Sequence, residues 1–164
     1  MTGEKICCFT GHRAFYDDTK EMSRILSVLL DNLLTQGYTV FRAGGALGFD
    51  MFASETVLNK RDDGRNLRLE LLLPCPEQDK GWSVANKARY RRILSLADSK
   101  EYIAESYTPS CMHERNRRLV EGSDICIAYC KKTGGGTAYT CRYAEKKGIR
   151  VINLATYLSA KPNV

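Results

Sequence analysis

The sequence predicts an α/β fold, a three-layer Rossmann-like sandwich with a mostly parallel sheet of about six strands. Six short apolar runs alternate along the chain with five segments of helical periodicity. Such alternation favours right-handed crossovers, which place parallel strands beneath helices on both faces of the sheet. With 164 residues, 43% of them hydrophobic, the chain is expected to form one domain over residues 1–164.

The first half of the chain begins with a predicted strand at residues 5–10. A helix is expected at 18–36, because its apolar residues recur every three or four positions, and Gly37 ends it. Asp18, with Glu21 three residues later, resembles a capping box. The next elements are a strand at 38–42, a helix at 47–59, a polar loop at 61–66 and a strand at 67–73, which Pro74 and Pro76 stop.

The second half of the chain repeats this alternation. Gly122 and Gly148 each end a helical segment, as glycine commonly does at the C-terminus of a helix. The apolar run DICIAY predicts a buried strand. In order, we expect a helix at 82–97, a strand at 101–104, a helix at 110–121, a strand at 124–129, a helix at 136–147 and a last strand at 149–154.

Composition narrows the class of protein. The sequence has no signal peptide and no apolar stretch near the roughly 20 residues that span a bilayer, so we expect a cytoplasmic protein that does not bind membranes. The seven cysteines are odd in number and include no C-x-x-C pair. This argues against a disulfide framework and a zinc site, so we predict buried cysteines and no bound metal.

The net charge of +6 can attract phosphates or nucleic acid, or can keep a protein soluble. Basic residues gather in two segments, and the first is interpreted as a solvated helix face because only Tyr90 places an aromatic ring within it. Nucleic-acid binding is therefore disfavoured but remains an alternative. The two segments contain Lys87, Arg89, Arg91 and Arg92, and Arg115, Arg117 and Arg118.

Three loops that follow predicted strands carry Gly, Thr and basic residues. Ligands of Rossmann-like sheets bind beyond the carboxyl ends of the strands, where strand order reverses, so these loops are expected to meet. Glycine lets a backbone approach phosphate oxygens, and the first turn of a helix offers free N–H groups and a positive dipole end. The loops are 10–13 (TGHR), 44–50 (GGALGFD) and 131–137 (KKTGGGT).

These glycine patterns differ from two common nucleotide-binding motifs. No G-x-G-x-x-G follows the first strand, and the acidic residue that accompanies it is missing, so hydride transfer is disfavoured. Residues 134–137 lack the glycine spacing and the Lys of a Walker A motif, so ATP hydrolysis loses its main support.

The order of the motifs resembles the SLOG superfamily, and within it the YpsA-like branch. That superfamily also includes the DNA-processing protein DprA and the lonely-guy phosphoribohydrolases. The resemblance implies a Rossmann-like domain that senses or processes nucleotide-derived ligands, and on this ground alone a homodimer is expected. From residue 6 to about 154 it is carried by TGHR at 10–13, GGALGFD at 44–50, the run 114–124, and GGGTAYT at 134–140 followed by Arg142-Tyr143-Ala144.

The phosphoribohydrolase pattern is only partly kept. Matching residues are Met112, His113, Glu114, Arg115, Gly134, Gly136 and Thr137, whereas Asn116, Lys132, Thr133 and Thr140 replace a Lys, a Pro, a Gly and a Glu. The resemblance implies that this Glu and the Arg are the catalytic pair. With Thr140 in its place, the carboxylate that would stabilise an oxocarbenium-like sugar or handle a proton is lost.

Several candidate residues have a plainer structural explanation. His12 is either a ligand contact or general acid, or a loop histidine bonded to the backbone. Asp50 either bonds a ribose or favours the start of a helix. Glu114 and Arg118 are spaced as a surface helix pair. Trp82 is chiefly expected to pack, with stacking on a base as the alternative.

The preferred function is binding of a nucleotide or nucleotide-derived ligand (AMP, ADP-ribose or NAD-like) by a sensor or regulatory protein. One alternative is an N-glycosidic phosphoribohydrolase of nucleoside monophosphates, with Arg115, Glu114 and His12 as candidate catalytic residues. The other is DprA-like binding of single-stranded DNA. The predicted ligand contacts are Thr10, Gly11, His12, Arg13, Gly44, Gly45, Asp50, Arg115, Asn116, Gly134, Gly135, Gly136 and Thr137.

Overall fold

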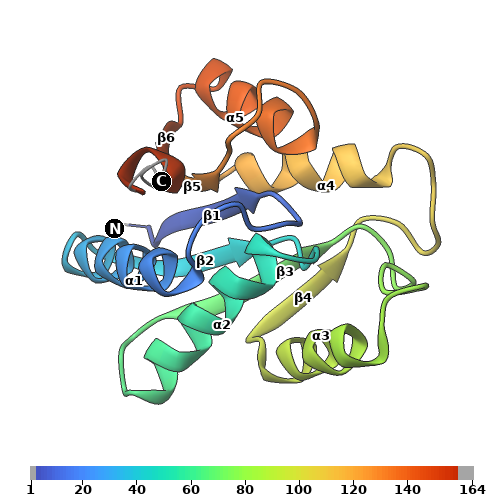
Figure 1. Cartoon of the computed structure of the whole chain (residues 1–164), viewed down its shortest axis with the longest axis horizontal. Helices are drawn as coiled ribbons and strands as arrows, with labels where there is room; N and C mark the ends of the chain where they lie inside the picture. The colour runs from blue at the N-terminus through green and yellow to red at the C-terminus, as the bar shows by residue number, and fades with distance from the viewer. Residues whose placement is uncertain (1–2, 159–164) are drawn as a thin grey trace, which may run out of the picture.

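The computed structural model describes residues 3–158 and contains a six-stranded sheet. The order across the sheet is β4-β3-β2-β1-β5-β6, and every neighbouring pair is parallel. The predicted α/β Rossmann-like sandwich is thereby confirmed (Figure 1). The strands are β1 (Lys5–Gly11), β2 (Tyr38–Ala43), β3 (Arg68–Leu73), β4 (Ser99–Tyr102), β5 (Ile125–Tyr129) and β6 (Arg150–Asn153).

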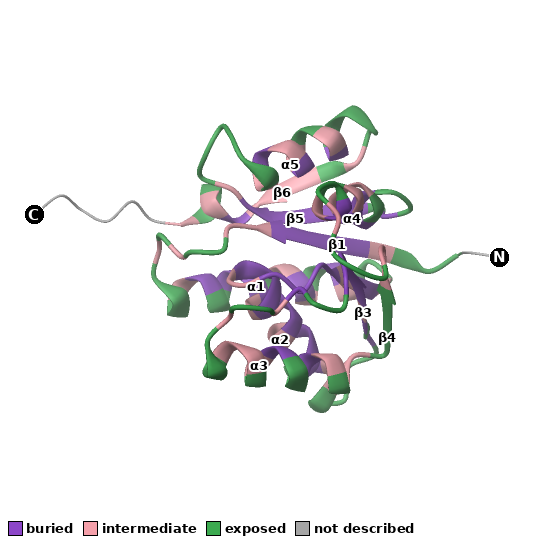
Figure 2. Cartoon of the chain, turned by 90° about the vertical axis from the view of Figure 1, so that its right-hand side faces the viewer, coloured by how far each residue is buried: buried purple, intermediate pink, exposed green. Residues whose placement is uncertain are grey.

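Helices cover both faces of the sheet (Figure 2). On one face lie α1 (Thr19–Thr35), α2 (Phe49–Asp62) and α3 (Val84–Leu96), and on the other α4 (Cys111–Val120) and α5 (Gly136–Lys146). A short 3₁₀ helix, η1 (Leu154–Tyr157), follows β6. The chain builds the sheet outward from β1 to β4 and then returns to add β5 on the other side of β1, so strand order reverses between β1 and β5.

The core is divided by the sheet, and successive residues of β1 face opposite sides. Cys7 and Phe9 belong to the larger core, whereas Cys8 packs with Leu119 and Cys126 in the smaller one. All seven cysteines are free thiols, and five of them are buried. Within residues 3–158, His, Cys, Asp and Glu side chains form no group that could hold a metal ion. Each described helix is too short or too polar to span a bilayer.

Element ends follow hydrogen bonds more than composition. Asp18 is the N-cap of α1, as predicted, and its carboxylate accepts from the N–H of Lys20 at 2.8 Å. The predicted loop at 61–66 is partly wrong, because α2 continues to Asp62. The predicted strand at 101–104 also begins too late. Asp98 exchanges hydrogen bonds with the backbone of Leu69, which sets the register of the polar edge strand β4 against β3.

Candidate functional site

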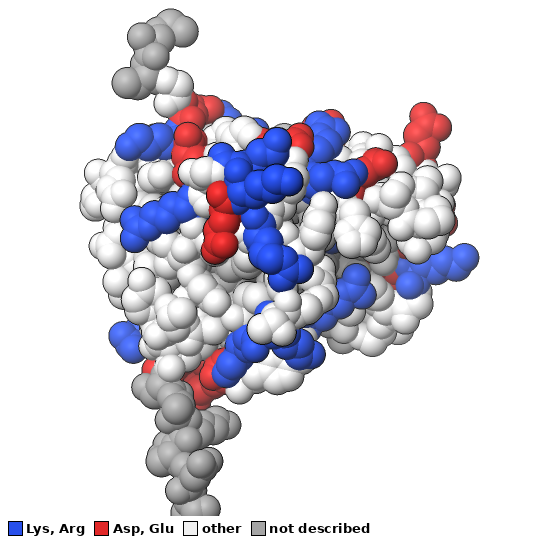
Figure 3. Space-filling model, turned by 90° about the horizontal axis from the view of Figure 1, so that it is seen from above, with Lys and Arg blue, Asp and Glu red and all other residues white. Residues whose placement is uncertain are grey.

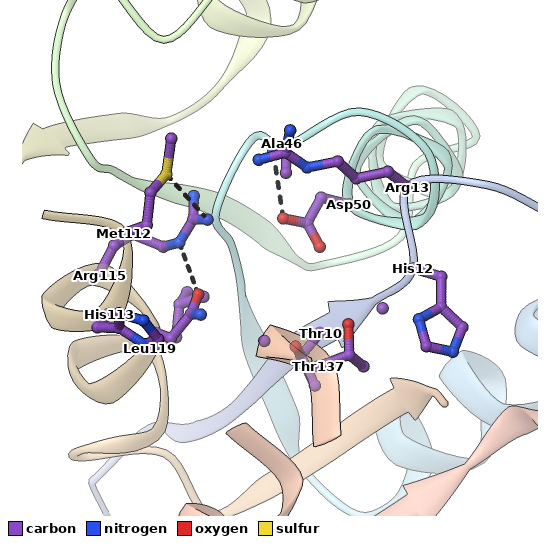
Figure 4. A pocket seen from close by; sticks show the side chains of 13 residues that line it. Thr10, His12, Arg13, Ala46, Asp50, Met112, His113, Arg115, Leu119 and Thr137 are labelled. Atoms are coloured by element: carbon purple, nitrogen blue, oxygen red, sulfur yellow. Dashed lines mark hydrogen bonds between the residues drawn. The ribbon is translucent and has the colours of Figure 1, made fainter. Parts of the chain in front are cut away.

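A cavity of about 390 Å³ opens where strand order reverses, beyond the carboxyl end of β1 and between the first turns of α2, α4 and α5. The predicted convergence of strand-end loops therefore occurs at this edge of the sheet. Figure 4 shows the residues that surround the cavity. They are Thr10, Gly11, His12, Arg13, Ala46, Asp50, Met112, His113, Arg115, Asn116, Leu119, Gly136 and Thr137.

Arg115, on α4, is tied into the protein on the inner side of the cavity. Its side chain is only 5% exposed, and one guanidinium N–H donates to the carbonyl of Gly44. Another N–H donates to Asn116 Oδ1 at 2.9 Å, and Met112 Sδ lies 3.8 Å from Nη2. Burial lowers the pKa of Arg115, while the nearby Asp50 carboxylate raises it. Much of the hydrogen-bonding capacity of this guanidinium is thus used inside the protein.

Asp50 lies in the first turn of α2 and is 5% exposed. Its Oδ2 accepts from the N–H of Ala46 at 3.2 Å, which favours the structural explanation for this residue. Burial raises its pKa to about 6, against the opposing effects of Arg115, the Ala46 N–H and Arg13. Because Asp50 also lines the cavity, it is a buried carboxyl group whose charge responds to what occupies the site.

His12 stands on the side of the cavity opposite Met112 and His113 (Figure 4). Its Nε2 accepts from the backbone N–H of Lys131 at 2.8 Å, so in the neutral ring Nδ1 carries the proton and can donate. Burial, followed by the charges of Lys132 and Lys131, lowers its pKa. The imidazole is therefore neutral near pH 7 and holds the loop that precedes α5.

The loop at 131–135 is anchored from outside the cavity. Lys131 forms an ion pair with Asp17 at 2.9 Å, and the Lys132 ammonium lies 5.2 Å from the centre of the Tyr16 ring. Arg142, on α5, donates to the carbonyl of Thr133 at 2.9 Å. These contacts hold the loop in place, while the space beside Gly134 and Gly135 is unfilled.

The start of α5 presents free polar groups to the cavity. Its N-cap, Gly135, provides no side chain to bond the first-turn amides, and Gly136 and Thr137 line the cavity. Thr10 lines the same cavity and is only 6% exposed. Within residues 3–158, no side-chain hydrogen bond engages the Thr10 or Thr137 hydroxyl. Two hydroxyls and the N-terminal end of a helix therefore face one space.

Nine of the predicted ligand contacts line the cavity: Thr10, Gly11, His12, Arg13, Asp50, Arg115, Asn116, Gly136 and Thr137. Gly134 and Gly135 lie just before it in the sequence, whereas Gly44 is buried against Arg115 and Gly45 against Leu73. Sequence reasoning missed Ala46, Met112, His113 and Leu119 as lining residues. Helical spacing from Arg115 would have indicated Met112 and Leu119, which lie three and four residues away on the same face.

Four other residues singled out in the sequence lie away from the cavity lining. Glu114 accepts from the hydroxyl of Ser110 at 3.3 Å, and Arg118 pairs instead with Glu101 at 2.7 Å. Trp82 packs against Tyr90, with ring centres 5.2 Å apart, as expected for a packing residue. Thr140 is buried, and its hydroxyl donates to the carbonyl of Gly136 at 2.8 Å.

Comparison with known proteins finds relatives of similar length. A UPF0398 protein of Bacillus licheniformis is 26% identical over 153 residues, which cover 87% of this chain and 84% of the relative. The UPF0398 protein YpsA of Bacillus subtilis is 24% identical over 154 residues, which cover 87% and 86%. The SPbeta prophage-derived protein YoqJ of B. subtilis is 27% identical over 139 residues, which cover 77% and 81%.

Solved structures share the fold. DNA processing protein A from Helicobacter pylori aligns with a TM-score of 0.63 and 22% identity, and DprA from Streptococcus pneumoniae with 0.64 and 19%. Each alignment covers 90% of this chain, which spans 63% and 49% of those two chains. The molybdenum cofactor carrier protein of Chlamydomonas reinhardtii aligns with a TM-score of 0.56 and 17% identity, covering 91% of this chain and 75% of the other.

The family comparison covers almost the whole chain. The YpsA model, which describes the YspA SLOG family, matches residues 7–157. That span includes β2 to β6, all of β1 except its first two residues, and every residue that lines the cavity. The resemblance inferred from the order of the motifs is confirmed, and the chain belongs to the YspA SLOG family.

Proposed function

We propose that this protein binds a nucleotide or nucleotide-derived ligand, with the phosphate at the start of α5, and acts as a sensor or regulatory protein. The observation that carries the proposal is that Thr10, only 6% exposed, lines the same cavity as the first turn of α5, which has no side-chain cap. A helix N-terminus favours anions because its amides are free and its dipole end is positive. Arg13 and the protonated nitrogen of His12 supply further donors at the rim.

The proposal excludes Arg115 as the main phosphate ligand. Its guanidinium already bonds Gly44 and Asn116, and its charge opposes the effect of burial on the pKa of Asp50. Gly44 and Gly45 lie against the side chains of Arg115 and Leu73. The anion contacts are thus assigned to Thr10, His12, Arg13, Gly136 and Thr137.

Thermal unfolding with added ligand tests this proposal. AMP, ADP-ribose and NAD are the probes, and inorganic phosphate is compared with them because it carries the anion alone. A ligand present at 100 times its Kd should add about 2.7 kcal/mol to the free energy of unfolding. If none of the four raises the midpoint of unfolding at millimolar concentration, the proposed nucleotide site is wrong.

Hydrolysis of nucleoside monophosphates is the enzymatic alternative. Thr140 stands where the lonely-guy phosphoribohydrolases carry a Glu. It is buried, and its hydroxyl donates to a carbonyl within its own helix. We therefore expect no release of free base from AMP at the rates of about 1 s⁻¹ or more that are typical of enzymes. Steady base release at such a rate, measured by chromatography, would establish the enzyme instead.

Binding of single-stranded DNA is a second candidate, favoured by the fold match to DprA and by surface charge. The structure of the H. pylori protein is described by its single-stranded DNA binding mode. Lys and Arg residues gather over α4 and α5, with acidic residues between them (Figure 3). Exposed members of this face include Lys132, Arg142, Lys146 and Lys147.

A salt titration distinguishes this candidate from the nucleotide site. Since the basic face carries few exposed aromatic rings, DNA should bind weakly, and the affinity should fall steeply as salt is raised. Nanomolar binding that persists at high salt would favour the DprA-like function over nucleotide sensing.

A further inference from the structure

A second hollow, of about 320 Å³, adjoins the main cavity on the side of Met112. Its lining comes from the segment after β3 and from the segment that leads into α4, namely Cys75, Glu77, Gln78, Lys80, Tyr107 and Met112. Met112 lines both spaces. Figure 4 places it on the side of the main cavity away from His12.

The chemistry of the second hollow differs from that of the main cavity. Tyr107 is 62% exposed, an unusual position for a large aromatic ring, and its faces are free to stack. Met112 adds a flexible, polarisable thioether, which packs well against aromatic rings. Glu77, Gln78 and Lys80 supply polar groups beside this apolar surface. A flat ring with hydrogen-bonding edges fits such a lining.

The wall between the two spaces is rigid. The Gln78 amide donates to the carbonyl of Gly45 at 3.2 Å and to the Tyr90 hydroxyl at 3.1 Å. Its Oε1 lies 3.4 Å from Nη1 of Arg115, which lines the main cavity. One buried hydrogen-bonded group therefore holds the segment after β3 to Arg115 beside the main cavity.

We propose that the second hollow is the subsite for the aromatic base of a nucleotide, with the ring stacked on Tyr107 and lying against Met112, while the phosphate occupies the main cavity. This inference rests on the proposed function and names the part of the ligand that the phosphate site leaves unassigned. It also moves the stacking role from Trp82, which is packed against Tyr90, to Tyr107.

Calorimetric titration with matched probes tests the subsite. The probes are AMP, GMP, CMP and UMP on one hand and ribose 5-phosphate, which lacks a base, on the other. The parent protein should bind at least one nucleotide more tightly than the sugar phosphate. Tyr107→Ala should weaken the binding of that nucleotide by about 5- to 150-fold, the range expected when one stacked base loses its aromatic partner. Its binding of ribose 5-phosphate should not change.

Two further variants act as controls. Tyr107→Phe keeps the ring and should bind the nucleotide as the parent does. Tyr157→Ala removes a similarly exposed ring, 55% exposed, from the distant helix η1 and should alter neither probe. Because Tyr107 is on the surface, circular dichroism should show an intact fold for all three.

The outcomes separate the two proposals. If nucleotides and ribose 5-phosphate bind the parent protein equally well, or if Tyr107→Ala weakens both to the same extent or neither, the base subsite is wrong while the phosphate site stands. If the parent protein binds none of the five probes, the base subsite is wrong, and the proposed function falls as well if ADP-ribose and NAD also fail to bind.

Discussion

The two glycine-rich turns at the sheet edge look alike in sequence and do different work in the structure. In the first, an added Cβ at Gly44 would lie 2.7 Å from Arg115 Nη1, and one at Gly45 would lie 2.6 Å from Leu73. At Gly134 and Gly135, in the second, it would meet nothing within 4 Å. Glycines of the first turn let the protein pack against itself, whereas those of the second leave a surface open.

The same contrast holds for the helices that the turns introduce. At the start of α2, the N–H of Phe49 donates to the carbonyl of His12, and Asp50 bonds the N–H of Ala46. Both helices have a glycine N-cap without a side-chain bond, but at the start of α5 two residues of the first turn, Gly136 and Thr137, face the cavity. A glycine cluster before a helix thus indicates close approach, but not whether protein or ligand approaches.

Replacement of Arg115 should have the largest effect, because its side chain occupies the space that Gly44 leaves. Arg115→Ala removes a long buried side chain and leaves the carbonyl of Gly44 without its donor, which should lower the free energy of unfolding by about 2–5 kcal/mol. Chemical denaturation measures this loss. Arg117→Ala, on the same helix but partly exposed, is the control. A variant as stable as the parent would show that Arg115 is free for ligand.

An added methyl group distinguishes the turns directly. Gly48 has a φ of +81°, and its Cβ would overlap the backbone of Arg13, so Gly48→Ala should cost about 2–4 kcal/mol of stability. Gly134→Ala in the other turn adds its methyl group to open space and should change stability by less than about 0.5 kcal/mol. Equal losses in the two variants would remove the distinction between packed and open turns.

The buried carboxyl of the first turn gives a pH signature. The pKa of Asp50 is about 6 in the folded protein against an ordinary 3.8, so the unfolded chain releases this proton first as pH rises. The contribution of Asp50 to the free energy of unfolding is therefore at its most favourable below about pH 4, and it is lost as the pH rises to about 6. Asn at position 50 cannot titrate. As the pH rises from about 4 to about 6, the free energy of unfolding of Asp50→Asn should therefore increase by up to about 3 kcal/mol relative to that of the parent.

Denaturation at pH 4, 5, 6 and 7 follows this difference. Asp62→Asn, at the exposed end of the same helix, is the matched control. A stability difference between Asp50→Asn and the parent that stays constant over this range would mean that the Asp50 carboxyl titrates normally.

The smallest expected effect lies at the end of β1, in the cavity that the open turn borders. Thr10→Val keeps the shape of the side chain but removes the hydroxyl that faces α5, so the nucleotide identified by thermal unfolding should bind about 2- to 12-fold more weakly. Thr56→Val makes the same change in α2, where the hydroxyl bonds the carbonyl of Phe52, and should leave binding unchanged. Unaltered affinity in both variants, measured by calorimetry, would argue against Thr10 as an anion contact.

The sequence by itself determined the fold class and the edge of the sheet that carries the cavity. Both follow from local signals, since apolar periodicity defines strands and helices, and parallel crossovers bring strand ends to one edge. It also indicated nine of the residues that line the cavity. It failed at the polar edge strand β4, where the register with β3 rather than any apolar pattern sets the start.

Only the tertiary structure decided which polar groups are already used. Arg115 and Thr10 were both candidate contacts, yet the guanidinium is bonded to a loop 71 residues away. The Thr10 hydroxyl lines the cavity and has no hydrogen bond to any side chain in residues 3–158. Sequence spacing cannot distinguish these cases, because hydrogen bonds between distant segments depend on how the segments pack. For the same physical reason, only the packed structure could distinguish glycines that lie against the protein's own side chains from glycines that leave an open surface.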